Sequence, residues 1–131
     1  MSSSSSRVHG FALLEALVAI LIFTVGVLGV IGLQATMNKA QGSAKFRADA
    51  AFLASSLIGT MWSDLPNLDQ YQSSACSTYA RCSQWSAAVS ARLPGGASTV
   101  TVAAGVVTIE IRWAVPGEGA HRYITSSTIQ V

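Results

Sequence analysis

The chain has 131 residues, which suits one modest domain with an appendage. Half of its residues are hydrophobic and only 11% are charged, a composition too apolar for a disordered chain and low in charge for a fully soluble domain. The formal net charge is +2 and the basic residues do not cluster, so nothing in the charge balance calls for a nucleic acid partner.

The N-terminal third changes abruptly from polar to apolar. Residues 1–10 form a short polar segment with five serines and one arginine ahead of Gly10. From Ala16 to Leu33 there is no charged residue. As a helix this run is roughly 27 Å long, close to the hydrocarbon thickness of a bilayer. Because a helix satisfies its own backbone hydrogen bonds in lipid, the run predicts a single membrane-spanning helix.

Two other interpretations of the apolar run stay open. One is a secretory signal peptide, although the run is long for a signal-peptide core and Glu15 fits that core badly. The other is an ordinary single-pass anchor. A carboxylate in an apolar helix is costly unless it is paired or near the interface. Glu15 therefore either reaches the headgroups from the first helical turn or has a dedicated cationic partner.

The stretch GFALLEALVAILI, residues 10–22, resembles the prepilin processing signal of type IV pilins and type II secretion pseudopilins. It combines a short polar leader that ends in Gly10, Phe11 directly after it, Glu15 four residues further on, and an uninterrupted apolar helix. The resemblance implies that an aspartyl prepilin peptidase at the inner membrane cuts between Gly10 and Phe11. It also implies N-methylation of the new terminal Phe11, and a structural subunit that is not an enzyme.

Phe11 and Glu15 are the expected assembly residues of such a subunit. Cleavage gives Phe11 a free, charged amine in the membrane region, where pairing with a carboxylate is strongly favoured over either charge alone. Pairing this amine with Glu15 of a neighbour would set the axial register of a fibre. Gly26, Gly29 and Gly32 each weaken the helix by about 1 kcal/mol relative to alanine. They serve either close helix packing or a segment that stretches or melts in a fibre.

The apolar run is predicted to continue as one long helix over residues 11–63, with a membrane-spanning half (11–33) and an amphipathic half (34–63). The residues that recur at helical spacing in the second half predict its packing face: Ala50, Leu53, Ala54, Leu57, Ile58 and Met61. Pro66 disfavours helix at the residue before it, so the helix is expected to end there.

Residues 64–131 are expected to form a small globular ectodomain. Residues 67–83 are interpreted as a loop that holds Cys76 and Cys82, whose spacing fits neither a zinc site nor a CxxC redox motif. In an oxidising compartment these cysteines can form one disulfide, and free thiols are the alternative. Residues 83–93 predict a short helix that ends at Pro94.

The last third of the chain predicts three β-strands. They cover residues 99–103, 107–113 and 121–131, with turns at residues 104–105 and 116–119. In the middle strand alternate residues share an apolar face: Val107, Ile109, Ile111 and Trp113. One wet face and one face against the long helix are expected. The fold class is therefore α+β and pilin-like, a long N-terminal membrane-spanning helix packed on a small antiparallel sheet.

No catalytic, cofactor or metal-ligand pattern is found in the sequence. His9 lies in the predicted leader, and His121 borders a strand as an exposed or packing residue. The three tryptophans are expected to be core or sheet-packing residues: Trp62, Trp85 and Trp113. A DNA-binding stripe would require the fold to gather four arginines: Arg81, Arg92, Arg112 and Arg122.

Further stretches resemble the PilV group of minor pilins: GVLGVIGLQ (26–34), RADAAFLA (47–54), CSQW (82–85) and YIT (123–125). The resemblance implies a subunit that joins other minor pilins and the major pilin, primes pilus assembly, sits at the fibre tip and sometimes carries a large adhesin. It implies an inner-membrane precursor with a periplasmic ectodomain, and later a place in the fibre at the cell surface. The close rival is the I-type minor pseudopilin of type II secretion. A secreted or anchored binding domain with a signal peptide is the alternative from a different class.

Overall fold

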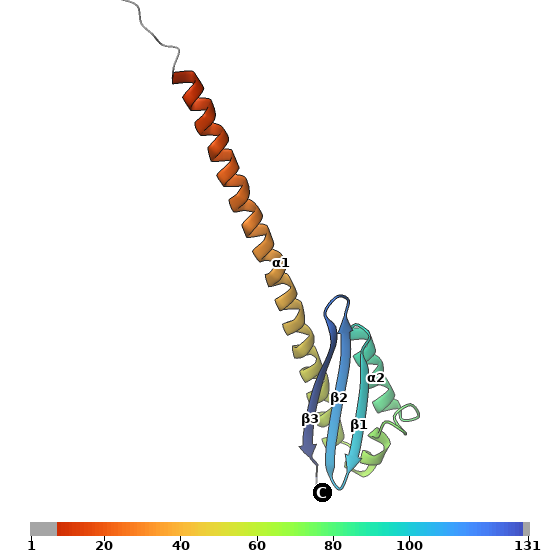
Figure 1. Cartoon of the computed structure of the whole chain (residues 1–131). Helices are drawn as coiled ribbons and strands as arrows, with labels where there is room; N and C mark the ends of the chain where they lie inside the picture. Colours follow the sequence, from red (N-terminus) through yellow and green to blue (C-terminus); the bar gives the residue numbers. More distant parts are fainter. Residues whose placement is uncertain (1–7, 130–131) are drawn as a thin grey trace, which may run out of the picture. The chain divides into compact units, whose positions relative to one another are not determined.

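The structure of the chain is a computed structural model that describes residues 8–129. Its elements in chain order are α1 (Val8–Trp62), the 3-10 helix η1 (Leu65–Tyr71), α2 (Ala80–Arg92), β1 (Ala97–Ala103), β2 (Val106–Val115) and β3 (Gly119–Thr128) (Figure 1). Most of the predicted leader, residues 1–7, lies outside the described residues, and so does the side chain of His9.

The chain divides into two compact units, with the boundary between Gly42 and Ser43. Helix α1 contributes residues to both of them. In the first unit the described residues are all helical, as expected for a run without proline whose backbone must satisfy itself. The large apolar side chains of this unit from Phe11 to Met37 are exposed, so nothing within the described chain covers them.

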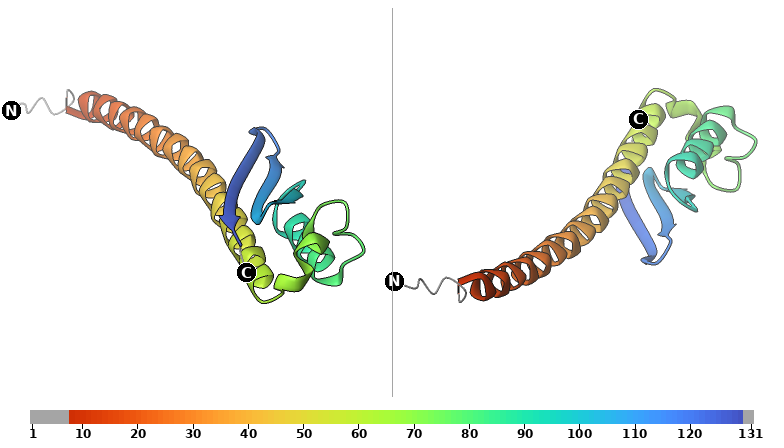
Figure 2. Two further views of the ribbon diagram at one scale, coloured as in Figure 1. Left: turned by 90° about the horizontal axis from the view of Figure 1, so that it is seen from below. Right: turned by 90° about the horizontal axis from the view of Figure 1, so that it is seen from above.

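The second unit is built around the predicted packing face of α1. Five of the six residues predicted from helical spacing are buried in one apolar core: Ala50, Leu53, Ala54, Leu57 and Met61. Ile58 is partly buried against the same core. The prediction of the packing face is therefore confirmed. The second part of α1 and helix α2 lie on the same side of the sheet, so this unit has one helical layer and one sheet layer (Figures 1 and 2).

The sheet has three antiparallel strands in the order β1-β2-β3. In β2 every second residue from Val107 to Trp113 is buried, which confirms the predicted inner face. The turns fall at the predicted places. Ala104 and Gly105 both have positive φ, and the second turn has positive φ at Gly117 and Gly119. The α+β, pilin-like arrangement expected from the sequence is the observed fold.

The predicted loop over residues 67–83 is wrong at both ends. Helix α1 ends at Trp62, next to the expected boundary at residue 63, but the residue before Pro66 is helical, because the fixed φ of Pro66 suits a first helical turn and η1 begins at Leu65. Helix α2 begins at Ala80 rather than Ser83. The earlier start places Cys82 on the buried face of α2 together with Trp85 and Val89.

Two of the three tryptophans are in the core as expected. Trp85 and Trp113 are buried, and the indole N–H of Trp85 donates to the carbonyl of Leu53 at 2.8 Å. Trp62, at the end of α1, is half exposed, which contradicts its expected place in the core. It follows Met61, whose side chain points into the core, so the helical turn carries Trp62 to another face.

Candidate assembly site

Gly10, Phe11 and Glu15 all lie on the first part of α1. Phe11 and Glu15 are four residues apart and therefore share one helix face, where they line a shallow groove with Leu14 and Val18. The side chains on this face, Phe11 included, are exposed. Among the described residues Glu15 forms no ion pair, so its carboxylate is available to a group from outside the chain.

The glycine before the predicted cleavage bond is not required by the fold. A Cβ added at Gly10 would meet no heavy atom within 4 Å. The same holds at Gly26, Gly29 and Gly32, where packing within the chain does not demand a small residue. These glycines therefore need an explanation from processing, from packing against other molecules, or from the flexibility of the helix.

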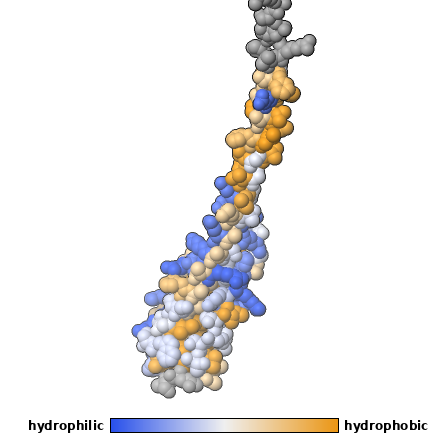
Figure 3. All heavy atoms as spheres, turned by 90° about the vertical axis from the view of Figure 1, so that its left-hand side faces the viewer, coloured by the Kyte–Doolittle hydropathy of each residue, from blue (hydrophilic) through white to orange (hydrophobic). Residues whose placement is uncertain are grey.

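Of the helices in the described residues, α1 is the one that is long and apolar enough to cross a membrane, by length and composition. Figure 3 shows apolar side chains gathered along the N-terminal part of this helix, and mixed polar and apolar side chains on the second unit. Cleavage before Phe11 would bring the helix N-terminus to within about one turn of Glu15, where a carboxylate is favoured by the helix dipole.

The N-terminal segment of the chain is similar to a known family motif. Residues 5–31 match the family model described as the prokaryotic N-terminal methylation motif. The match supports a type IV pilin-like prepilin. Pilin-like proteins of this kind are structural subunits rather than enzymes, and their motif implies processing by a prepilin peptidase and assembly with other pilins in a membrane. No curated protein and no solved structure matches the chain.

The second unit of the chain holds a polar cluster that sequence reasoning missed. The Asp64 cluster consists of Asp64, Asn67, Tyr71, Tyr79 and Arg81. Asp64 is buried, and its carboxylate accepts hydrogen bonds from both tyrosine hydroxyls and, at 2.8 Å, from the Asn67 amide. The Arg81 guanidinium lies 3.6 Å away. The cluster thereby joins the end of α1 to η1, the disulfide loop and α2.

These contacts hold Asp64 in its charged form. The hydrogen bond from Tyr79, followed by those from Asn67 and Tyr71, lowers the pKa of Asp64 from 3.8 to about 2. Burial and the bond to Asp64 raise the pKa of Tyr71, so its hydroxyl stays protonated and continues to donate. Sequence patterns carry only a weak signal of this cluster, because its five residues are spread over 18 positions.

The cluster predicts a specific loss of stability in acid. The folded-state pKa of Asp64 lies below its unfolded value. The contribution of its carboxylate to the free energy of unfolding is therefore fully present above about pH 4 and is lost as the pH falls towards 2. We expect the urea midpoint of the full chain in detergent, followed by Trp fluorescence, to fall less between pH 5 and pH 2 in Asp64→Asn than in wild type. Asp69→Asn, at an exposed carboxyl, is the control and should keep the wild-type pH dependence. Equal pH dependence in wild type and Asp64→Asn would contradict the expectation.

The predicted disulfide is present. The sulfur atoms of Cys76 and Cys82 are bonded, and the described residues contain no free cysteine. Cys82 is fully buried on α2, and Cys76 packs against the same core from the loop. The bond therefore fastens the loop to the core through α2.

Reduction of this disulfide is expected to lower the free energy of unfolding by about 2–3 kcal/mol, because the closed loop is short and its entropy gain in the unfolded state is modest. Urea unfolding with and without dithiothreitol measures the difference. The Cys76→Ala/Cys82→Ala double variant should be less stable and insensitive to the reductant. Full alkylation of both cysteines in protein isolated without reductant would show that the bond does not form.

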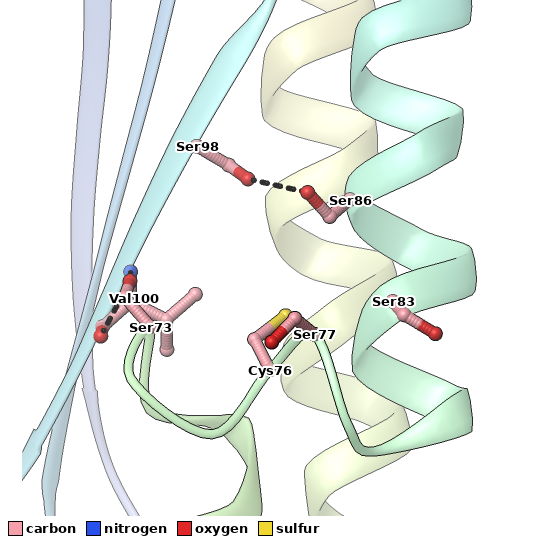
Figure 4. A pocket seen from close by; sticks show the side chains of 7 residues that line it. All are labelled: Ser73, Cys76, Ser77, Ser83, Ser86, Ser98 and Val100. Carbon is pink, nitrogen blue, oxygen red and sulfur yellow. Dashed lines mark hydrogen bonds between the residues drawn. The ribbon is translucent and has the colours of Figure 1, made fainter.

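A hollow of about 380 Å³ lies beside the disulfide, between the loop, α2 and β1 (Figure 4). Five serines line it, together with Cys76 and Val100: Ser73, Ser77, Ser83, Ser86 and Ser98. The Ser73 hydroxyl accepts a hydrogen bond from the Val100 N–H at 2.7 Å, and the Ser73 N–H donates to the Val100 carbonyl at 3.0 Å. No acid, base or cation lines the hollow, so it offers no catalytic constellation.

His121 is a packing residue, one of the two roles expected for it. Its ring stacks on Trp113 at 5.7 Å, and its Nε2 lies 3.9 Å from a carboxylate oxygen of Glu118. Within residues 8–129 no group of three potential metal ligands occurs. The four arginines that a DNA-binding stripe would require lie in two different layers. Arg81 and Arg92 are on α2, while Arg112 and Arg122 are opposite each other on the outer face of the sheet.

Proposed function

We propose that this chain is a minor pilin of a type IV pilus, of the PilV type, which helps to prime assembly and occupies the fibre tip. The observation that carries the proposal is the geometry of the N-terminus. The Gly10–Phe11 junction precedes an exposed apolar helix, and Glu15 lies one turn beyond Phe11 on the same face. The match to the methylation motif covers this same segment.

The proposed sequence of events begins with a precursor in the inner membrane, its ectodomain in the periplasm. Prepilin peptidase cuts after Gly10, and the amine of Phe11 is methylated. The mature subunit then joins other minor pilins and the major pilin, and it contributes to a tip that is able to carry an adhesin. These steps require no cofactor bound to the chain itself, because the methyl donor is a substrate of the processing enzyme. The small second unit, fastened by its disulfide, supplies the part of the subunit that is exposed beyond the membrane.

Fractionation of cells that lack or contain the chain tests the proposal. We expect the native protein in sheared surface fibres, with a mature mass that starts at Phe11 and includes one methyl group. Deletion should reduce the number of surface pili. Normal piliation together with a loss of secreted proteins would favour the I-type pseudopilin. A mature protein that has lost the whole apolar run would instead indicate a signal peptide and a secreted binding domain.

A further inference from the structure

An open groove follows the seam between α1 and α2 in the second unit. Its volume is about 420 Å³. Helix α1 contributes Phe52, Leu53, Ser56 and Thr60 to its lining, and α2 contributes Arg81, Gln84, Trp85, Ala88 and Arg92. The α2 residues recur at spacings of three and four, so one face of α2 forms a continuous wall of the groove.

One arginine lies near each end of this face of α2. Arg81 and Arg92 are eleven positions apart on α2, which separates their Cα atoms by about 16 Å along the helix. Both side chains are exposed, Arg81 to 53% even though its guanidinium lies near Asp64. Arg92 has no carboxylate within ion-pair distance among the described residues.

An exposed aromatic ring lies beside Arg92. Phe52 is 60% exposed, and the Arg92 guanidinium lies over its ring at 5.5 Å from the centroid. A large exposed phenyl ring next to an arginine without a carboxylate partner is the composition found at the centre of protein interfaces, where aromatic residues and arginine are enriched. The groove therefore combines one exposed aromatic ring with the positive charge of Arg92, while the charge of Arg81 already faces the Asp64 carboxylate.

A second copy of this chain offers few free carboxylates to the groove. Glu110 and Glu118 already lie against Arg112 and His121, and Asp64 is buried in its cluster. Glu15 belongs to the apolar part of α1. Only two carboxylates of the described residues, Asp49 and Asp69, remain outside such arrangements.

We propose that this groove binds an acidic segment of a different pilin subunit, with a carboxylate facing Arg92 and a neighbouring apolar side chain against the exposed part of Phe52. The proposal rests on the proposed function, since the occupant is another subunit of the same assembly. Beyond that function, the groove proposal names the chemical groups by which the other subunit is recognised. Opposite charges at the rim of an interface steer association and suppress wrong partners.

Photo-crosslinking in the native cells tests this choice of occupant. A benzoylphenylalanine at Gln84, which is exposed in the groove, should crosslink the full chain to a different pilin subunit through a peptide that contains Asp or Glu. Arg92→Glu should lower the crosslink yield by at least about tenfold, because like charges are then juxtaposed. Changing the identified carboxylate of the partner to lysine should restore the yield with Arg92→Glu.

Two further variants keep the test decisive. Arg122→Glu makes the same charge change on the outer face of the sheet and should leave the yield unchanged. Phe52→Ala removes the exposed ring without reversing a charge and should also lower the yield, so the test does not depend on one variant. An unchanged yield in both Arg92→Glu and Phe52→Ala would overturn the proposal, as would a crosslink between two copies of this chain or no crosslink to any subunit.

Leader cleavage is measured in the same samples. Arg92→Glu should be cut between Gly10 and Phe11 as efficiently as wild type. An unchanged crosslink in correctly processed, fibre-associated protein overturns the groove proposal and leaves the proposed function standing. A wild-type chain that is neither cut at this bond nor found in fibres overturns the proposed function itself.

Discussion

Replacement of Glu15 by alanine is expected to leave leader cleavage and membrane insertion largely intact while sharply reducing entry into the fibre. Cleavage depends on the Gly10–Phe11 junction, and insertion depends on the apolar run, which alanine lengthens. Assembly differs because the Phe11 amine must enter an apolar environment with a partner. Removal of one member of a desolvated pair typically costs about 3–5 kcal/mol, because the remaining charge is stranded. Incorporation should therefore fall by about two to three and a half orders of magnitude.

The measurement is the ratio of Glu15→Ala protein in sheared fibres to that in the membrane fraction, together with the number of pili. Glu15→Gln is the matched variant, since it keeps the size of the side chain and removes only the charge. Both variants should fail alike if charge pairing is responsible. Because Glu15 is not among the core residues of the second unit, neither variant should change the stability of that unit. Normal incorporation of both variants would show that Glu15 is only an interfacial residue at the start of the helix.

Gly10→Val is expected to block leader removal. The peptidase must accept the residue before the bond, and a β-branched side chain is both bulkier and stiffer than glycine. The fold itself gives no reason for a defect, since a side chain at Gly10 meets no heavy atom within 4 Å. Intact-mass measurement of the membrane fraction should therefore find the unmethylated precursor in place of a mature chain that starts at Phe11.

Gly29→Val is the matched control for this prediction. It introduces the same side chain into the same helix, again at a position where a Cβ meets nothing within 4 Å. Its leader should be removed normally, whatever its effect on assembly. Mature protein from Gly10→Val at the wild-type level would mean that Gly10 does not define the cleavage bond.

The regular elements of this fold could be predicted because their signals are local. The spacing of Leu53, Leu57 and Met61 identifies the packing face of α1, and strict alternation identifies the buried face of β2. The N-terminal motif was equally accessible, since its residues are neighbours in sequence. For that reason the same short segment carried both the resemblance and the family match.

The segment from Asp64 to Tyr79 could not be predicted in the same way. Asp64 reads as a helix-terminating residue, but its burial depends on donors that arrive from η1, the loop and α2. Such a network has no fixed spacing, and each of its members is common on protein surfaces. The groove at Phe52 was hidden for a related reason, because Arg92 reaches Phe52 only when α2 lies beside α1.

The two hydrogen bonds between the backbone of β1 and Ser73 have a consequence for solubility. Val100 directs its N–H and carbonyl towards the free edge of the sheet, where an uncovered strand acts as a template for pairing with another chain. The N–H of Ser73 donates to the Val100 carbonyl, and the Ser73 hydroxyl accepts from the Val100 N–H, so neither group is left open. The loop that carries Ser73 therefore blocks edge-to-edge pairing with a strand of another molecule, so loss of Ser73 is a route to aggregation even where the fold survives.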